Sequence, residues 1–423
     1  MTRTAHRLTN LLPGDRRFAL LLSSLAVSSC GDWLYNVALL AIVFERTHSA
    51  TWLAATTAAR ISPVVVFGPL GGALADRYDR RRLIITSDLL RASLMVALAG
   101  VVVAGLPIVL APVIAAAATA AGVVHPPCVA ACTARLVADD ELQRASVLRS
   151  ATGQAAIVVG PGLGALVLLL TSPTVAIALN ALTFLASAAA VTAIAPGEAL
   201  RPPAGEADAL RIHLLADMRA GAQALRGAPA TIRLVAVDVI CSVVAGILTV
   251  TFVLVARRVG AGNSGYGLLF GAFGAGGLIG AAVTARIEAT AHWRRAIAVA
   301  LLVVGGAVAG LGVAPGLFAA LLLALLVGGG SIVGEVLVET ALPRLLDPDV
   351  LGRAYGLAFP AALLGIVAGS LIAGPLVGLL GIGGAFGAVG VYVLLAGGLL
   401  VNRPLEVTSL ARIAESPALE RGH

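Results

Sequence analysis

Long apolar segments, each about the length of a membrane-spanning helix, recur along the whole chain. A helix needs about 20 predominantly apolar residues to cross the hydrocarbon core of a bilayer. Divided at charges and at Gly/Pro turns, the sequence gives twelve such segments. They cover residues 18–43, 50–74, 83–104, 106–132, 150–171, 174–195, 232–256, 264–285, 295–314, 316–341, 355–380 and 382–402. The pattern predicts an all-α membrane protein with twelve transmembrane helices.

The longest polar segment, residues 196–231, divides these spans into two sets of six. It contains RPPAGEADALRIHLLADMRAGAQALRGAP, which has too many charges to lie in hydrocarbon. The polarity pattern of its later part is typical of an amphipathic helix on the membrane surface. We therefore expect an N-terminal six-helix half (1–195), a cytoplasmic linker (196–231), a C-terminal six-helix half (232–402) and a cytoplasmic tail (403–423).

Composition narrows the class of protein. The chain is 59% hydrophobic and 12% charged, whereas a soluble domain is about 25% charged. It contains no P-loop, HExxH, GxSxG or Cys/His metal pattern. An enzyme, a metal site and a cofactor are therefore not expected. The four cysteines all lie within apolar segments, where they are interpreted as small buried hydrophobes.

Arginine supplies all 29 basic residues and is distributed unequally between the two sides of the predicted bundle. With the N-terminus inside, the outer loops contain only Arg46, Arg257 and Arg258. Arg60 and Arg91 lie within spans, and the remaining arginines fall on the inner side. The positive-inside rule then places both termini on the cytoplasmic side of the cytoplasmic (inner) membrane. The net charge of +7 thus reflects topology, and no nucleic-acid partner is expected.

An internal repeat relates the two halves. RLVADDELQRA (135–145) matches RLLDPDVLGRA (344–354) at six of eleven positions. At the same offset of 209 residues, GPLGGALADR (68–77) falls on GLIGAAVTAR (277–286). Two parallel copies of a six-helix unit, with a substrate site between them at mid-membrane, are a design of secondary transporters.

Polar residues gather in the first, fourth, seventh and tenth spans, which are equivalent under this repeat. In the first span, Ser24, Ser28, Asp32 and Asn36 are spaced four apart and share one helix face. We expect these spans to line a wet central cavity. The candidate cavity-lining residues are Ser28, Asn36, Arg60, His125, Ser242 and Ser331.

Acidic residues within the spans are candidates for proton coupling. A charge at the bilayer centre costs roughly 2.5–3.5 kcal/mol on insertion scales, so a function is the default hypothesis for it. Asp32 is the strongest candidate, because it lies near the middle of the polar-striped first span. The alternative is a structural carboxyl satisfied by Ser28 and Asn36. Asp32 is also one candidate partner for Arg60. The coupling candidates are Asp32, Asp238, Glu335 and Glu339.

Two helices are interrupted by Gly/Pro pairs. A proline inside a helix frees a backbone carbonyl and bends the helix, and neighbouring glycines permit close packing. The hinge or packing candidates are Gly160, Pro161, Gly164, Gly374 and Pro375. His125 precedes Pro126–Pro127, which predicts a kink in the fourth span.

The charged segment GGALADRYDRRRL (71–83) lies on the cytoplasmic side between spans 2 and 3. It resembles the loop signature of the major facilitator superfamily, with Asp79 in place of that signature's second glycine. The matching residues are Gly72, Asp76, Arg77, Asp79, Arg80 and Arg81. GDW (31–33), DLLRA (88–92) and GPGLG (160–164) also resemble the drug and siderophore exporter branch, which includes macrolide-efflux proteins and the enterobactin exporter. The basic residue that many proton antiporters carry in span 4 has no counterpart here.

The resemblance implies the major facilitator fold and the export of small amphipathic molecules by alternating access and proton antiport. Its partners would be the small-molecule substrate, protons and the lipid bilayer, and the protein is expected to act as a monomer. The resemblance also implies that Asp76 meets the N-terminal end of the span that starts near Tyr355, closing the inner mouth. Candidate gate partners are Asp139, Asp140, Asp349, Arg144 and Arg353.

Two other functions remain open at this stage. One is uptake or facilitated transport of a small polar metabolite, and the other is a non-transporting membrane scaffold. The scarcity of aromatic and hydrogen-bonding residues in the cavity spans disfavours a sugar importer.

Overall fold

The computed structural model describes residues 16–138, 140–195, 197, 229–284, 293–345 and 348–402, and the regular structure in these ranges is helical. The amphipathic linker helix and the C-terminal tail expected from the sequence lie outside the described residues. In chain order the helices are α2 (Arg16–Thr47), α3 (Ala50–Arg77), α4 (Arg80–Val103), α5 (Leu110–Gly122), α6 (His125–Leu136), α7 (Leu142–Leu170), α8 (Pro173–Thr192), α10 (Pro229–Arg258), α11 (Gly262–Thr284), α12 (Trp293–Leu311), α13 (Leu317–Leu345) and α14 (Pro348–Asn402).

Within the described ranges, ten helical segments are long and apolar enough to cross a membrane, and Arg295–Leu311 is a shorter apolar helix. One of the ten, Ala358–Gly398, contains the last two predicted spans and breaks at Gly381, where φ is 68° and ψ is 174°. A positive φ of this kind favours glycine. The helices are therefore consistent with the twelve predicted spans.

The fourth span contains the predicted kink. It consists of α5 and α6, and α6 begins at His125 with prolines in its first positions. Proline is well accommodated there, because the first helical N–H groups have no partner within the helix.

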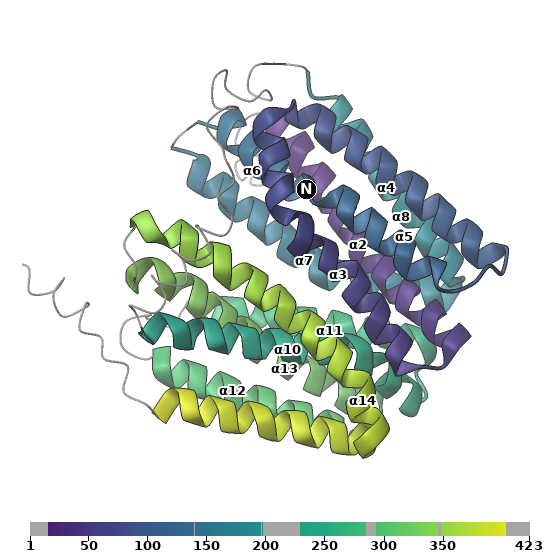
Figure 1. The fold of residues 1–423 in the computed structure, drawn as a ribbon, viewed down its shortest axis with the longest axis vertical. Coiled ribbons are helices and arrows are strands. Elements are labelled where there is room, and N and C mark those ends of the chain that lie inside the picture. The colour runs from purple at the N-terminus through teal and green to yellow at the C-terminus, as the bar shows by residue number, and fades with distance from the viewer. Residues whose placement is uncertain are drawn as a thin grey trace, which may run out of the picture.

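The helices form two bundles, α2–α8 and α10–α14, which lie side by side (Figure 1). Equivalent helices make equivalent pairs. α2 packs against α7 as α10 packs against the first part of α14, where Gly246 meets Ile366, and α3 packs against α5 as α11 packs against α13. The bundles meet where α7 packs against α11 and α3 against α14. This repeated packing is the structural form of the repeat seen in the sequence.

Two of the three outer arginines occupy equivalent positions in the two bundles. Arg46, at the end of α2, donates a hydrogen bond of 2.6 Å to the Val102 carbonyl at the end of α4. Arg258, at the end of α10, donates one of 2.5 Å to the Gly312 carbonyl beyond α12. A cation at a helix C-terminus satisfies its free carbonyls and its dipole. These two arginines therefore cap helix ends at corresponding places in the two bundles.

α11 and α13 approach so closely that the backbone of one meets the backbone of the other. A Cβ atom on Gly276 would collide with the Leu325 carbonyl, and one on Gly328 would collide with the Phe273 carbonyl. Glycine allows such contact in membranes, where helix association depends on close packing.

We expect Gly276→Val to destabilise the protein by about 1–3 kcal/mol or more, because a backbone carbonyl cannot rotate away as a side chain can. The matched control is Gly306→Val on α12, where an added Cβ meets no heavy atom within 4 Å. Thermal unfolding of the purified variants in detergent measures the difference. Equal losses of melting temperature in the two variants would contradict this account of the α11–α13 contact.

Candidate transport site

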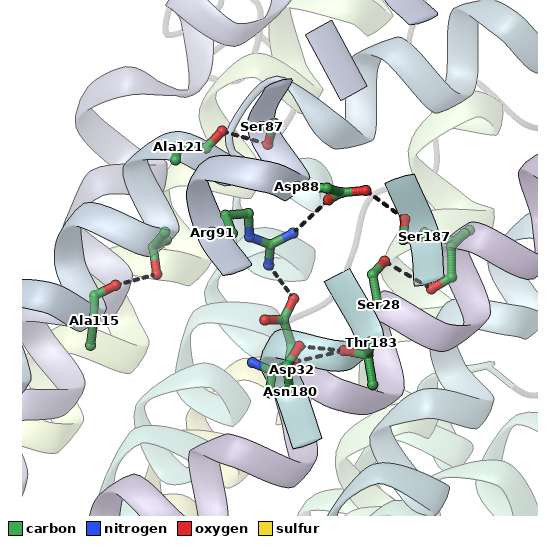
Figure 2. Close-up of polar contacts among 12 residues, drawn as sticks. Ser28, Asp32, Ser87, Asp88, Arg91, Ala115, Ala121, Asn180, Thr183 and Ser187 are labelled. Atoms are coloured by element: carbon green, nitrogen blue, oxygen red, sulfur yellow. Dashed lines mark hydrogen bonds and ion pairs between the residues drawn. The ribbon is translucent and has the colours of Figure 1, made fainter. Parts of the chain in front are cut away.

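A charged cluster lies in the middle of the first bundle and joins α2, α4 and α8 (Figure 2). Arg91 Nη2 lies 2.5 Å from Asp32 Oδ2, and Arg91 Nη1 lies 3.7 Å from Asp88 Oδ1. The Ser187 hydroxyl donates to the other Asp88 oxygen at 2.6 Å. The Asp88 side chain is fully buried, whereas that of Asp32 is 32% exposed. One guanidinium therefore bridges a buried and an accessible carboxylate.

The surrounding side chains hold Arg91 in this position. Its guanidinium lies 3.9 Å from the centre of the Phe184 ring on α8. At the end of α5, a Cβ on Gly122 would lie 3.2 Å from Arg91 Nε. Cation–π contact strengthens when water is excluded. Aromatic and glycine neighbours thus fix the arginine between the two carboxylates.

Gly31 brings α2 close enough to α8 for this arrangement. A Cβ at Gly31 would collide with the side chains of Asn180 and Thr183. Thr183 in turn donates to Asn180 Oδ1 at 2.9 Å. The GDW and DLLRA segments thus meet in space, because Gly31 and Asp32 come from the first, and Asp88 and Arg91 from the second.

The sequence pattern predicts a role for Asp32 but none for Asp88, Arg91 or Ser187. The partner of Asp32 is Arg91, and Arg60 forms no ion pair among the described residues. An acid and a base three residues apart in an apolar helix face each other. The three-residue spacing of Asp88 and Arg91 in DLLRA was therefore the sequence signal that indicates their pairing.

The other cavity candidates of the first bundle are buried, except Arg60. Ser28 is 2% exposed and donates to the Leu25 carbonyl, Asn36 is 1% exposed, and His125 is 5% exposed. Arg60 is half-buried. The structure thus places polar groups along this stripe, mostly within packed interior.

In the second bundle, two coupling candidates lie near each other. Asp238 on α10 and Glu335 on α13 both interact electrostatically with Cys241. Ser331 is 7% exposed and Ser242 is half-buried. The side chain of Glu339 lies outside the described set. The second bundle thus carries two acidic side chains of its own close to Cys241.

At the inner end of α3, two residues of the signature segment anchor helix ends. Asp79 caps α4 by accepting a hydrogen bond of 3.1 Å from the backbone N–H of Arg82. Such caps contribute about 1 kcal/mol, which gives a structural reason for Asp79 in place of glycine. Arg81 donates to the carbonyls of Thr192 (2.7 Å) and Ile194 (2.9 Å) at the end of α8.

One face of this end of α3 is left unpacked, although Ala75 on the same helix is buried. Arg80 donates to the Ala75 carbonyl, and its Nη2 lies 3.9 Å from Asp76, whose side chain is 52% exposed. No heavy atom lies within 4 Å of where a Cβ on Gly68 or Gly72 would stand. Arg77, Asp140 and Arg144 are exposed. The remaining gate candidates, Asp139, Asp349 and Arg353, lie outside the described side chains.

The opposite end of the bundles is held together by contacts between them. Asn263 of α11 donates to Glu45 of α2 and accepts from Arg257 at 2.9 Å. The Arg257 guanidinium also lies 5.2 Å from the centre of the Phe44 ring. This outer clasp includes the third outer arginine and joins the first bundle to the second.

The central helices show the same asymmetry along their length. α2 is buried on all sides from Leu34 to Val43, whereas Ser23 and Val27 in its inner half are exposed. α10 is likewise buried from Gly246 to Val253. The structure is therefore closed around the outer clasp and more open around the end where α2 begins.

The glycines proposed as hinges or packing points lie at close helix contacts. A Cβ on Gly160 would strike Trp33 of α2, and one on Gly164 would lie 3.0 Å from the Leu34 carbonyl. The Pro161 carbonyl oxygen faces Gly267 of α11. A Cβ atom added to Gly267 would lie 2.8 Å from that oxygen. Around Pro375, a Cβ on Gly374 would lie 3.2 Å from the Thr51 backbone nitrogen of α3.

Two repeated bundles of apolar helices, the first with a buried charged cluster, are the architecture of a polytopic secondary transporter. The chain matches the transmembrane secretion effector family over residues 14–420 and belongs to that family of the major facilitator superfamily.

Related proteins and structures agree with this assignment. The uncharacterised MFS-type transporter YfiS of Bacillus subtilis is 26% identical over 387 residues, 89% of this chain and 90% of that one. Macrolide efflux protein A of Streptococcus pyogenes is 27% identical over 33% of this chain and 35% of its own. The putative bacilysin exporter BacE of Bacillus amyloliquefaciens is 25% identical over 63% and 65%.

Among solved structures, the nucleoside transporter NupG superposes with a TM-score of 0.73 at 10% identity, covering 91% of this chain and 98% of that chain. A bacterial homologue of the lysosomal transporter Spinster, inward-facing and unoccupied, superposes with a TM-score of 0.70 at 12% identity, covering 92% and 97%. At such identities the likeness concerns the fold alone.

Proposed function

We propose that this protein exports small amphipathic molecules across the cytoplasmic membrane by alternating access, driven by proton antiport. The observation that carries the coupling is the bridge from Asp32 through Arg91 to Asp88. Export as the direction is supported by relatives named as a macrolide efflux protein and a bacilysin exporter.

The cluster can convert a proton into a change of helix contacts. Asp32 is accessible and holds Arg91 through one oxygen at 2.5 Å. Protonation removes the charge that makes this hydrogen bond strong, and leaves Arg91 with Asp88 alone. The contact between α2 and α4 then weakens while that within α4 remains. A ligand that binds two conformations with unequal affinity shifts their populations. The proton on Asp32 acts as such a ligand, because it favours the conformation in which the contact between α2 and α4 is weaker.

Proteoliposomes with an imposed pH gradient and a pH-sensitive dye test this function. With a panel of amphipathic drugs and siderophores outside, inside-out oriented protein should accumulate at least one compound in exchange for protons. Accumulation that ignores the gradient would overturn proton antiport. A protein that accumulates none of the panel, but releases a polar metabolite loaded inside these vesicles, would reverse the proposed direction.

Asp76→Asn is expected to shift the conformational equilibrium toward the inner-open form and to reduce flux, with substrate affinity nearly unchanged. Asp76 is half-exposed in this structure and lies 3.9 Å from Arg80, so its loss removes only a weak, partly solvated ion pair from the present state. In the inner-closed state the carboxylate would meet a helix N-terminus for about 0.3–2 kcal/mol. Cysteine accessibility at the two membrane faces measures the shift, and equal labelling of mutant and wild type would refute the gate.

Both termini are proposed to be cytoplasmic. A reporter fused after His423, or inserted in the 196–231 segment, should then be active only as a cytoplasmic reporter, because the arginine bias fixes orientation. Periplasmic activity at either site would contradict the topology.

A further inference from the structure

Four buried polar groups near the junction of the bundles make no well-formed hydrogen bond, although two of them, on Asn36 and Tyr266, lie close enough to interact with each other. They are the amide nitrogen of Asn36, the hydroxyls of Thr57 and Tyr266, and Nε of Arg60. Arg60 also makes no ion pair among the described residues. Buried polar groups in proteins are nearly always satisfied. An unpaired guanidinium within a membrane span is costly and marks a functional site by default.

Thr57 stands out among the threonines of the helices. Threonine hydroxyls in this protein commonly bond to the carbonyl four residues earlier, as Thr56 does with Trp52 at 2.7 Å. The Thr57 hydroxyl does not, although the residue is 1% exposed. Thr57 and Arg60 are three apart on α3 and share a face. Both therefore present free donors to the same side.

Arg60 and Asn36 of the first bundle lie at one depth, and Tyr266 of the second bundle reaches them from nearer its helix end, four residues from the start of α11. Arg60 is ten residues from the start of α3, and Asn36 is eleven residues from the end of α2. At 1.5 Å per residue, both lie about 15–16 Å below the outer ends, near the bilayer centre. Arg60 interacts electrostatically with the Tyr266 hydroxyl of α11, which also lies against Asn36. The donors thus face one another across the inter-bundle junction.

We propose that Arg60, with Thr57, Asn36 and Tyr266 around it, binds a carboxylate of the transported molecule. A carboxylate offers acceptors only, and a guanidinium matches it with two parallel hydrogen bonds. Each of the four groups can donate a hydrogen bond, so an acceptor-rich anion can satisfy them and neutralises the Arg60 charge. The two carboxylates near Arg91 are already engaged with it. This inference rests on the proposed export function and names the chemistry of its substrate.

Antiport adds a second requirement to the substrate. Protonating Asp32 makes the site more positive and would strengthen binding of a pure anion, which would then move with the proton. Exchange requires the substrate and the proton to compete, and a cationic group on the substrate does so at Asp32. The molecule is therefore an amphipathic zwitterion. The titratable and charged groups around Asp32 are Arg91 and Asp88 of α4, His125 of α6, Arg60 of α3 and Tyr35 of α2.

Hydrophobic dipeptides test both ends of the molecule separately. The panel includes Phe-Leu, Leu-Phe and Val-Trp. Each dipeptide is prepared in four forms: with both ends free, with the N-terminus acetylated, with the C-terminus amidated, and with both ends blocked. Binding to the protein in nanodiscs is measured by calorimetry. The free form of at least one dipeptide should bind wild type at least tenfold more tightly than its C-amide. In Arg60→Gln the two forms should bind within twofold of each other, with the C-amide affinity unchanged. Arg82→Gln, which removes an exposed cytoplasmic charge, should keep the tenfold preference.

The outcomes separate this inference from the export proposal. Equal binding of acid and amide to wild type, no binding of any free dipeptide, or a preference that survives in a folded Arg60→Gln variant, overturns the carboxylate site. N-acetylation should weaken binding to wild type but not to Asp32→Asn. If it weakens neither while the amide still binds tenfold more weakly, the carboxylate site stands and the zwitterion and antiport fail. Melting temperatures of all variants verify that they are folded.

Discussion

Arg91→Gln is expected both to lower the amount of folded protein in the membrane and to abolish export. Asp88 is fully buried, and its countercharge is Arg91. Removing one partner of a buried ion pair costs about 3–5 kcal/mol, because the other charge is left in a medium of low polarity. Native proteins are stable by only about 5–15 kcal/mol. The expected loss is thus a large part of the total.

A double variant separates stability from transport. Arg91→Gln with Asp88→Asn removes both buried charges, so the yield and melting temperature should return toward those of wild type. Export should not return, because Asp32 no longer has a cation to hold or release. Size-exclusion chromatography of fluorescent fusions measures the folded yield, and Arg82→Gln is the charge-matched control. A single Arg91→Gln variant that folds and melts like wild type would show that Asp88 is not ionised in the folded protein.

The spans could be predicted from sequence because a bilayer leaves the backbone few choices. Unsatisfied peptide groups are so costly in hydrocarbon that each apolar segment must be a helix. The break at Gly381 and the kink before Pro126–Pro127 could also be predicted from the sequence, because glycine and proline change the backbone conformation locally. The repeat at an offset of 209 residues likewise foretold equivalent helix pairs.

The partner of Asp32 could not be predicted in this way. Whether Asp32 meets Arg91 of α4 or Arg60 of α3 depends on how three helices are rotated about their axes. That rotation is set by close contacts such as Gly31 against Asn180 and Thr183. Glycine-rich sequence offers many such contacts, and only the packed structure shows which one forms.

The arginine-rich segment illustrates a different limit. Arg81 and Asp79 satisfy helix ends in the first bundle, whereas the pattern of charges alone favoured pairing with distant carboxylates. A gate has different contacts in each state of its cycle. One structure shows one state, and the unpacked face at Gly68 and Gly72 is where the other state would differ.

Asp32→Asn is expected to abolish export driven by a pH gradient while leaving exchange of substrate against substrate largely intact. Asparagine keeps the size and can still accept a hydrogen bond from Arg91, but it cannot gain or lose a proton. Asp32→Glu should retain part of the coupling, because it keeps the titrating group and displaces it by one methylene. We expect a large loss of pH-driven export because Asp32, with 32% of its side chain exposed, is the carboxylate of the bridge that is accessible to protons.

Proteoliposomes loaded with substrate provide both measurements on one preparation. Uphill flux under a pH gradient should fall to background in Asp32→Asn. Exchange at equal pH should remain within about threefold of wild type when substrate is saturating, because saturation offsets the affinity lost with the contact at Asp32. The control is Glu141→Gln, which removes a carboxylate at the start of α7 that makes no side-chain capping bond. Normal uphill flux in Asp32→Asn would make Asp32 structural. The coupling role would then move to Asp238 and Glu335, whose shared proximity to Cys241 already places two acids together in the second bundle.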